Sequence, residues 1–171
     1  MTPDPGPGPA QAAAGNGATI HASAVAHCGR GCLIIGRAGS GKTTLALEMM
    51  ALGAVLIADD RVRLTRAGAR LALAPPPQLA GLIEIRGAGI LRVARHAAGV
   101  DLWLAADLDR TAPERMPSPA ETVVGGVAVP SIPCRDRPAA AASLMAILAA
   151  GSLPDPEFLP DPEPPADGGA S

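Results

Sequence analysis

One segment limits what this chain can fold into more than any other. Residues 36–43 read Gly-Arg-Ala-Gly-Ser-Gly-Lys-Thr and match the pattern G-x-x-x-x-G-K-[ST] in full. Glycines in such a loop let backbone N–H groups turn inward around a phosphate, and a following helix adds its positive dipole end. An apolar stretch precedes the loop and an amphipathic one follows it. We therefore predict a strand–loop–helix unit that binds nucleotide phosphates, a P-loop.

The sole lysine of the chain, Lys42, falls inside this loop, whereas the other 13 basic residues are arginines. A compact ammonium group between phosphates cannot easily be replaced by a planar guanidinium. We expect Lys42 to bridge the outer phosphates and the Thr43 hydroxyl to bind Mg²⁺. The predicted nucleotide-binding residues are Gly36, Arg37, Ala38, Gly39, Ser40, Gly41, Lys42 and Thr43.

Turn residues and apolar periodicity predict one α/β domain over residues 19–153. The helix after the loop should cover 42–52, with Leu45, Met49 and Leu52 on its apolar face and Gly53 ending it. The other predicted elements are paired strands at 21–27 and 31–35, a buried strand at 54–58, hairpins at 61–66 with 70–74 and at 82–86 with 90–93, a strand at 100–106, a polar loop at 109–121, an extended segment at 122–132 and an Ala-rich helix at 138–150.

The two ends of the chain differ from this domain in composition. Residues 1–18 consist mostly of Pro, Gly and Ala, and residues 154–171 alternate Pro with acidic residues. Neither stretch can bury enough apolar surface to offset its ordering entropy, so we predict two disordered tails, the second of them acidic and Pro-rich. The tails hold six of the 16 acidic residues and no base, which leaves a mildly basic domain between them.

Two charged motifs follow the loop. Asp59 and Asp60 come directly after the predicted buried strand, where phosphoryl transfer needs one group on Mg²⁺ and one at the attacking hydroxyl. Adjacent strand residues point to opposite faces, so the two acids cannot share one role. Alternation in residues 83–86, Ile-Glu-Ile-Arg, would put Glu84 and Arg86 on one face of a strand, as a functional pair or as an exposed ion pair.

The cysteines and the hydropathy exclude other classes of protein. Cys28, Cys32 and Cys134 fit no zinc pattern, so we expect reduced thiols. A signal peptide begins with a positively charged region, but no Lys or Arg precedes Arg30. No apolar run approaches the ~20 residues of a membrane span. We predict a cytoplasmic protein with neither a membrane nor nucleic acid as a partner.

Taken in order, these pieces resemble a known family. His21 stands 15 residues before Gly36, and the P-loop is followed by Ala-Asp-Asp at 58–60, Ala-Pro at 74–75 and Ile-Glu-Ile-Arg-Gly-Ala-Gly-Ile at 83–90. This combination resembles the catalytic domain of HPr kinase/phosphorylase, in its short form, over about residues 19–110. The resemblance implies an α/β P-loop kinase domain of the phosphoenolpyruvate-carboxykinase-like kind, with a mixed β-sheet and flanking helices.

The resemblance also implies an activity and roles for residues. It implies ATP- and Mg²⁺-dependent phosphorylation of a serine on an HPr-like carrier protein of the phosphotransferase system, with phosphorolysis of the phosphoserine able to share the site. Asp59 would be the base toward the seryl hydroxyl, supported by His21 and Asp60. Thr43 and Glu84 would bind the metal, with Arg86 nearby. Arg115 would be a catalytic-loop arginine, and the family's usual homo-oligomer is a hexamer.

Two other functions fit the same motifs. A small-molecule kinase on the same scaffold would share every motif before Asp109 and transfer phosphate to a metabolite hydroxyl. A nucleotide-binding regulator without transfer activity would bind nucleotide even after loss of Asp59. The identity of the acceptor and the presence of turnover distinguish these functions from the carrier kinase.

Overall fold

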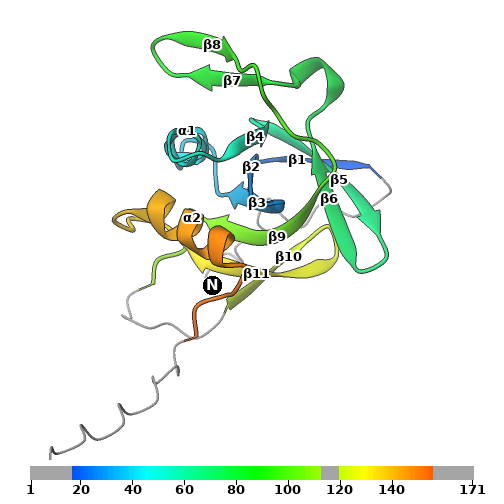
Figure 1. Ribbon diagram of the computed structural model, residues 1–171, viewed down its shortest axis with the longest axis vertical. Helices are drawn as coiled ribbons and strands as arrows, with labels where there is room; N and C mark the ends of the chain where they lie inside the picture. The colour runs from blue at the N-terminus through cyan, green and yellow to red at the C-terminus, as the bar shows by residue number, and fades with distance from the viewer. Residues whose placement is uncertain (1–16, 113–119, 156–171) are drawn as a thin grey trace, which may run out of the picture.

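A computed structural model describes residues 17–112 and 120–155, which form a mixed β-sheet with two helices (Figure 1). The sheet runs in the order β1-β5-β6-β9-β3-β2-β4, and β11 joins it beside β9 and carries β10. Its strands are β1 (Ala18–His21), β2 (Ser23–His27), β3 (Arg30–Ile35), β4 (Val55–Ala58), β5 (Arg61–Ala67), β6 (Arg70–Ala74), β9 (Val100–Asp107), β10 (Ala120–Val124) and β11 (Val127–Pro133). β9 lies parallel to β3 and β11, and the other pairings are antiparallel. The predicted mixed sheet with flanking helices is confirmed.

Two α-helices, a two-stranded hairpin and a short 3₁₀ helix lie outside the sheet among the described residues. Helices α1 (Lys42–Ala51) and α2 (Ala140–Ala150) lie side by side on one face of it (Figure 1). Strands β7 (Leu82–Ile85) and β8 (Gly89–Arg92) form a separate two-stranded hairpin that projects at the top of Figure 1. A short 3₁₀ helix, Pro77–Leu79, precedes that hairpin.

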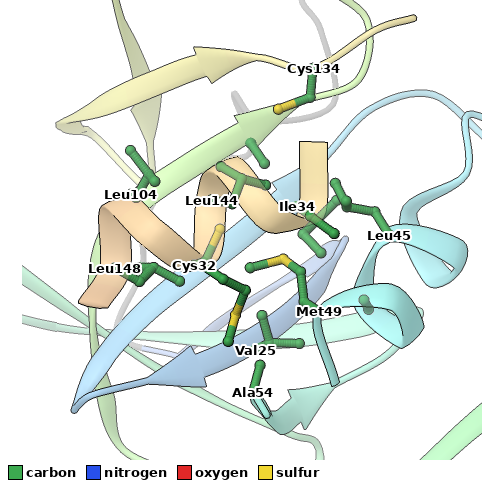
Figure 2. Close-up of a cluster of buried hydrophobic side chains, with 14 of the residues drawn as sticks. Val25, Cys32, Ile34, Leu45, Met49, Ala54, Leu104, Cys134, Leu144 and Leu148 are labelled. Carbon is green, nitrogen blue, oxygen red and sulfur yellow. The ribbon is translucent and has the colours of Figure 1, made fainter. Parts of the chain in front are cut away.

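Side-chain alternation along the central strands builds a core on each face of the sheet. In β3, Cys32 and Ile34 pack beneath α1 and α2 together with Leu104, Met49 and Leu144 (Figure 2). The intervening residues of β3, Leu33 and Ile35, join a second core with Ile57, Val62 and Leu73 on the opposite face. Strands buried on both faces read as unbroken apolar runs, which explains the sequence that leads into the 36–43 loop.

Most predicted elements are confirmed. The corrections concern strand boundaries that are set by pairing with distant segments. The segment predicted as one strand from His21 to His27 is divided between β1 and β2, because β1 pairs with β5 whereas β2 pairs with β3 and β4. β1 also begins at Ala18, which we had placed in the tail. The segment predicted as extended from Thr122 to Ile132 is a hairpin, turning at 125–126 through two glycines with positive φ.

Helix α1 buries two of the three residues predicted for its apolar face. Leu45 and Met49 are buried as expected, but Leu52 is 54% exposed and Ala46 is fully buried instead. The helix ends at Ala51 with Leu52 as its C-cap, so Leu52 no longer follows the helical periodicity. The chain then turns at Gly53 in the left-handed region, as predicted.

Some expectations concern residues outside the described ranges. Arg115 and all but the innermost residues of both predicted tails lie there. Within residues 17–112 and 120–155, no helix is long and apolar enough to cross a membrane. The three cysteines are free thiols, with Cys28 exposed and Cys32 and Cys134 buried.

Candidate active site

The loop 36–43 opens into a cavity of about 320 Å³ at the N-terminus of α1. The cavity lies between that helix, the start of β2, the end of β4 and the β7–β8 hairpin. Most of its lining residues carry charged, imidazole or hydroxyl side chains. The lining residues are His21, Ser23, Gly39, Gly41, Lys42, Thr43, Thr44, Leu47, Asp60, Glu84 and Arg86. Residues far apart in the sequence therefore meet around the predicted phosphate loop.

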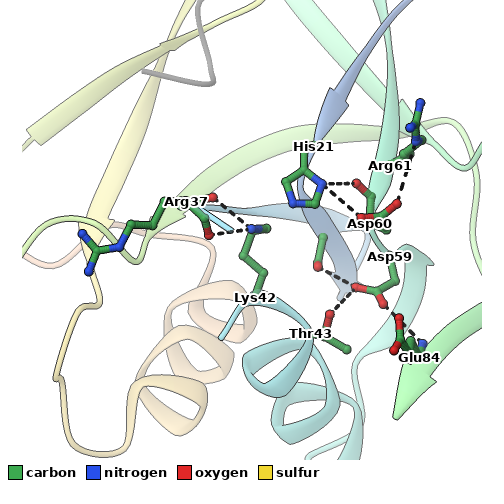
Figure 3. A network of polar contacts seen from close by, with 10 residues as sticks. His21, Arg37, Lys42, Thr43, Asp59, Asp60, Arg61 and Glu84 are labelled. Carbon is green, nitrogen blue, oxygen red and sulfur yellow. Dashed lines mark hydrogen bonds and ion pairs between the residues drawn. The ribbon is translucent and has the colours of Figure 1, made fainter. Parts of the chain in front are cut away.

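Lys42 lies folded against its own loop. Its Nζ donates hydrogen bonds of 2.9 Å to the carbonyl oxygens of Gly36 and Arg37, and its side chain is buried (Figure 3). Desolvation lowers the pKa of Lys42 below its ordinary value, while the carboxylates of Asp109, Asp60 and Asp59 act in the opposite direction. These carbonyl contacts keep the ammonium group at the mouth of the loop, beside the backbone N–H groups of the first turn of α1.

The two adjacent acids occupy different environments. Asp59 is 6% exposed, and its Oδ1 accepts hydrogen bonds from the Thr43 hydroxyl at 2.9 Å and from the Ser23 hydroxyl at 2.7 Å. Its Oδ2 accepts a longer bond, 3.4 Å, from the backbone N–H of Glu84. Asp59 thus joins β2, α1 and β7 (Figure 3). It is not among the residues that line the cavity.

Asp60 faces the cavity instead, beside His21. Nδ1 of His21 lies 2.9 Å from the carbonyl oxygen and 3.1 Å from Oδ1 of Asp60, whose side chain is 62% exposed. The Arg61 N–H donates to the Asp59 carbonyl at 2.8 Å, which closes a γ-turn around Asp60 with a φ of 65°. Such backbone conformations are costly and gather at functional sites. The two acids thus differ in both burial and partners.

Glu84 and Arg86 lie on the hairpin side of the cavity. Glu84 is in β7, whereas Arg86 begins the turn after that strand, so the two are not on one strand face as predicted. Ile83 is buried beneath them, in keeping with the expected alternation. Both charged side chains still line the same cavity as Lys42 and Thr43.

Sequence analysis missed two residues that support this site. Ser23 lies two residues after His21, and a serine within an otherwise apolar strand was a signal that we overlooked. Asp109 accepts the Arg37 N–H on both carboxylate oxygens, at 2.9 and 3.1 Å. It follows β9, and the carboxyl ends of the parallel strands β3 and β9 meet at one edge of the sheet.

The oxygen atoms around Thr43 have the chemistry that a magnesium ion prefers. Thr43 and Asp59 offer a hydroxyl and a carboxylate in contact, and the Glu84 carboxylate lines the same cavity. Within the described ranges, no three His, Cys, Asp or Glu side chains gather closely enough to hold a metal by themselves. Mg²⁺ suits such a partial set, because it is usually bound by one or two protein oxygens together with substrate phosphates and water.

Comparison with known proteins supports the family that the motifs indicate. The HPr Serine kinase C-terminal domain matches residues 13–100, about half of the chain. HPr kinase/phosphorylase of Caldicellulosiruptor bescii is 40% identical over 76 residues, which are 44% of this chain and 24% of that protein. The Bordetella pertussis enzyme of the same name is 41% identical over 76 residues, 44% of this chain and 25% of its own length. The aligned part is thus about a quarter of these curated relatives.

A solved structure extends the likeness beyond the aligned segment. The HPr(Ser) kinase/phosphatase of Coxiella burnetii superposes with a TM-score of 0.63 at 26% identity, over 78% of this chain and 95% of that one. The family's sequence pattern covers the loop and both charged motifs, and the shared structure reaches past them. This chain therefore belongs to the family of the HPr serine kinase C-terminal domain.

Proposed function

We propose that this chain is an ATP- and Mg²⁺-dependent protein-serine kinase that phosphorylates a small HPr-like carrier. The observation that carries the proposal is the separation of its two acids, with Asp59 against Thr43 of the phosphate loop and Asp60 against His21 on the open side. Phosphoryl transfer needs one acid on the metal side and another at the acceptor hydroxyl. The likeness to HPr kinase/phosphorylases supports the choice of acceptor.

The phosphate side of the proposed site is a P-loop on a phosphoenolpyruvate-carboxykinase-like domain. The N–H groups of the loop and the first turn of α1 would bind the phosphates, and Lys42 would exchange its carbonyl contacts for phosphate oxygens. Thr43, Asp59 and Glu84 would hold Mg²⁺, which supplies neutralising charge between the phosphates when it is bound. The burial of Lys42 favours this exchange, because a charge removed from water gains from an anionic partner.

We assign the acceptor base to Asp60 in place of Asp59, the residue that the family resemblance suggested. Oδ1 of Asp59 already accepts hydrogen bonds from two hydroxyl groups, and Asp59 is buried and does not line the cavity. Asp60 lines the cavity and has an exposed carboxylate. It would take the seryl proton as the serine oxygen bonds to the γ-phosphorus and the bond from that phosphorus to the leaving ADP oxygen breaks.

His21 and Arg86 would assist on the same side. Since a carbonyl oxygen only accepts, the short contact from His21 Nδ1 to the Asp60 carbonyl places a hydrogen on Nδ1 and orients the ring. In phosphorolysis of the phosphoserine, an oxygen of inorganic phosphate would bond to the phosphoserine phosphorus to give pyrophosphate. The bond from that phosphorus to the serine oxygen would break, and Asp60 would return the proton to the serine oxygen. Arg86 lines the cavity where a second anionic group would approach. The cytoplasmic location, the hexamer and the role of Arg115 stay predictions.

The test is incubation of the purified chain with ATP, Mg²⁺ and the HPr-like carrier from the same source, read by intact-mass spectrometry. We expect one added phosphate on the carrier, none on a carrier whose target serine is replaced by alanine, and none with Asp60→Asn. ATP turnover with a metabolite but not with the carrier would indicate the small-molecule kinase. ATP binding without turnover on any acceptor would indicate the silent regulator.

A further inference from the structure

Ser23 makes the shortest side-chain hydrogen bond to Asp59. Its hydroxyl donates to Asp59 Oδ1 at 2.7 Å, and Thr43 donates to the same oxygen at 2.9 Å. Ser23 is 1% exposed and Asp59 6% exposed, so water cannot readily replace this contact. A serine on β2 therefore shares one carboxylate oxygen with the hydroxyl that we propose binds Mg²⁺.

The hydrogen bond from Ser23 ties the Asp59 carboxylate to a third element of the fold, β2. The carboxylate follows β4, Thr43 lies in the first turn of α1, and Ser23 begins β2, the neighbour of β4 in the sheet. The remaining contact, from the Glu84 N–H to Oδ2, is 3.4 Å long and lies on the separate hairpin. Without Ser23, Oδ1 keeps only Thr43 as a donor, and the carboxylate is less restrained against rotation about its side-chain bonds.

We infer that Ser23 is a positioning residue that sets the affinity of the nucleotide site for its divalent cation. It does so by holding Asp59 Oδ1 against Thr43. Hydrogen-bond partners behind a metal ligand typically change metal affinity 10–100-fold when they are removed. The inference rests on the proposed function for the identity of the bound group, a metal–nucleotide complex.

The experiment separates metal binding from nucleotide binding and from activity. ADP affinity is measured by calorimetry in EDTA and again with saturating Mg²⁺, and Mn²⁺ binding to the protein–ADP complex is titrated by electron paramagnetic resonance. For Ser23→Ala we expect ADP affinity in EDTA within twofold of wild type and a Mn²⁺ dissociation constant raised about 10-fold. Ser23→Cys, a weaker donor of similar size, should show the same loss, whereas Ser23→Thr should restore wild-type affinity.

The matched control is Ser131→Ala. Ser131 in β11 is 3% exposed, and within the described part of the chain its hydroxyl has no hydrogen-bond partner. Removing it deletes a buried hydroxyl away from the cavity, so its Mn²⁺ affinity should equal that of wild type. Thermal unfolding of each variant establishes that it is folded before it is titrated.

Three results with the variants would overturn the inference. These are an unchanged Mn²⁺ dissociation constant in folded Ser23→Ala and Ser23→Cys, an equal loss in Ser131→Ala, or a loss of ADP affinity in EDTA as large as the loss with metal. Wild-type protein that binds ADP equally with and without Mg²⁺ would also overturn it. Failure of phosphate transfer to the carrier, with the metal effects intact, would reject the proposed kinase function and leave this inference standing.

Discussion

His21 and Asp60 face one another across the first pairing of β1 with β5, with Nδ1 of His21 3.1 Å from Asp60 Oδ1. In that pairing His21 lies opposite Arg61, and the γ-turn before β5 turns the Asp60 carboxylate toward the ring. The carboxylate also has a looser ion pair, 3.8 Å, with Nε of Arg61. An exposed carboxylate oriented by an imidazole beside the proposed phosphate loop is suited to take a proton from a hydroxyl.

Replacing Asp60 with asparagine should therefore block proton transfer while the nucleotide site stays intact. We expect Asp60→Asn to lower the transfer rate by about 10²–10⁴-fold, the range for a lost acid–base group. Mg²⁺–ADP affinity should stay within a few-fold of wild type, because Asp60 makes no contact with Thr43. Mass spectrometry of the carrier in samples quenched at set times measures the transfer rate, and calorimetry with ADP measures the nucleotide affinity. Equal losses of binding and transfer would assign Asp60 to the metal instead.

Replacing Asp59 should instead weaken the binding of the metal ion and leave metal-free nucleotide binding intact. We expect Asp59→Asn to raise the Mg²⁺ concentration needed for half-maximal transfer by about 10-fold or more, since the neutral amide is a weaker partner for the cation and its ligands. ADP affinity in EDTA should change little. Transfer measured over a Mg²⁺ titration at fixed ATP gives the result. If saturating Mg²⁺ restored nothing, and Asp60→Asn kept wild-type rates, Asp59 would be the base after all.

Lys42 should be required for transfer because it is the buried cation of the loop. We expect Lys42→Ala to lower the transfer rate by about 10²–10³-fold, as for other lost donors to developing charge. Lys42→Arg should not rescue it, since a guanidinium cannot take the place of a compact ammonium group at the Gly36 and Arg37 carbonyls.

Arg135→Ala is the control for loss of a cation, because Arg135 is exposed and pairs with its neighbour Asp136. This variant should keep the wild-type rate. Near-normal transfer by Lys42→Ala would contradict the P-loop assignment.

Local patterns predicted much of this architecture. The apolar run before the loop, the hairpin at Cys28–Gly29 and the turn at Gly68 follow from short-range chemistry, and each lies where expected. The cavity-lining residues Lys42, Thr43, Asp60, Glu84 and Arg86 were named from motifs, and His21 was named from the family resemblance. The division of the first predicted strand failed because it depended on pairing between distant segments. Nothing local divides His21 from Ser23, since β1 becomes a separate strand only by pairing with β5.

The different environments of the two acids could also not be predicted from the sequence. Alternation predicted opposite directions for Asp59 and Asp60, but not which of them would lie behind the loop. That outcome depends on the turn at Asp60 and on two hydroxyls from other elements, Ser23 and Thr43. The serine gave only a weak signal, because a buried hydroxyl becomes informative once its partner is known.

The buried thiols give a prediction for stability that is independent of the active site. Burial raises the pKa of Cys134 to about 11 from an ordinary 9.0, with Arg137 acting to lower it and Asp107 to raise it further. Burial also raises the pKa of Cys32, which lies beneath α2 in the same core. Both thiols therefore stay protonated in the folded protein at pH values where an unfolded chain would release their protons.

The sign of the effect follows from this difference in bound protons. Above about pH 9 the unfolded chain binds fewer protons than the folded one, so the free energy of unfolding falls as pH rises toward 11. Two pKa units correspond to a loss of about 2–3 kcal/mol from Cys134 alone. Urea unfolding at pH 8, 9, 10 and 10.5 should show this decline, and Cys134→Ala should make it shallower even if its stability at pH 8 is lower. Cys28→Ala, which removes an exposed thiol, should keep the wild-type slope. An unchanged slope in Cys134→Ala would mean that the thiol keeps its ordinary pKa in the fold.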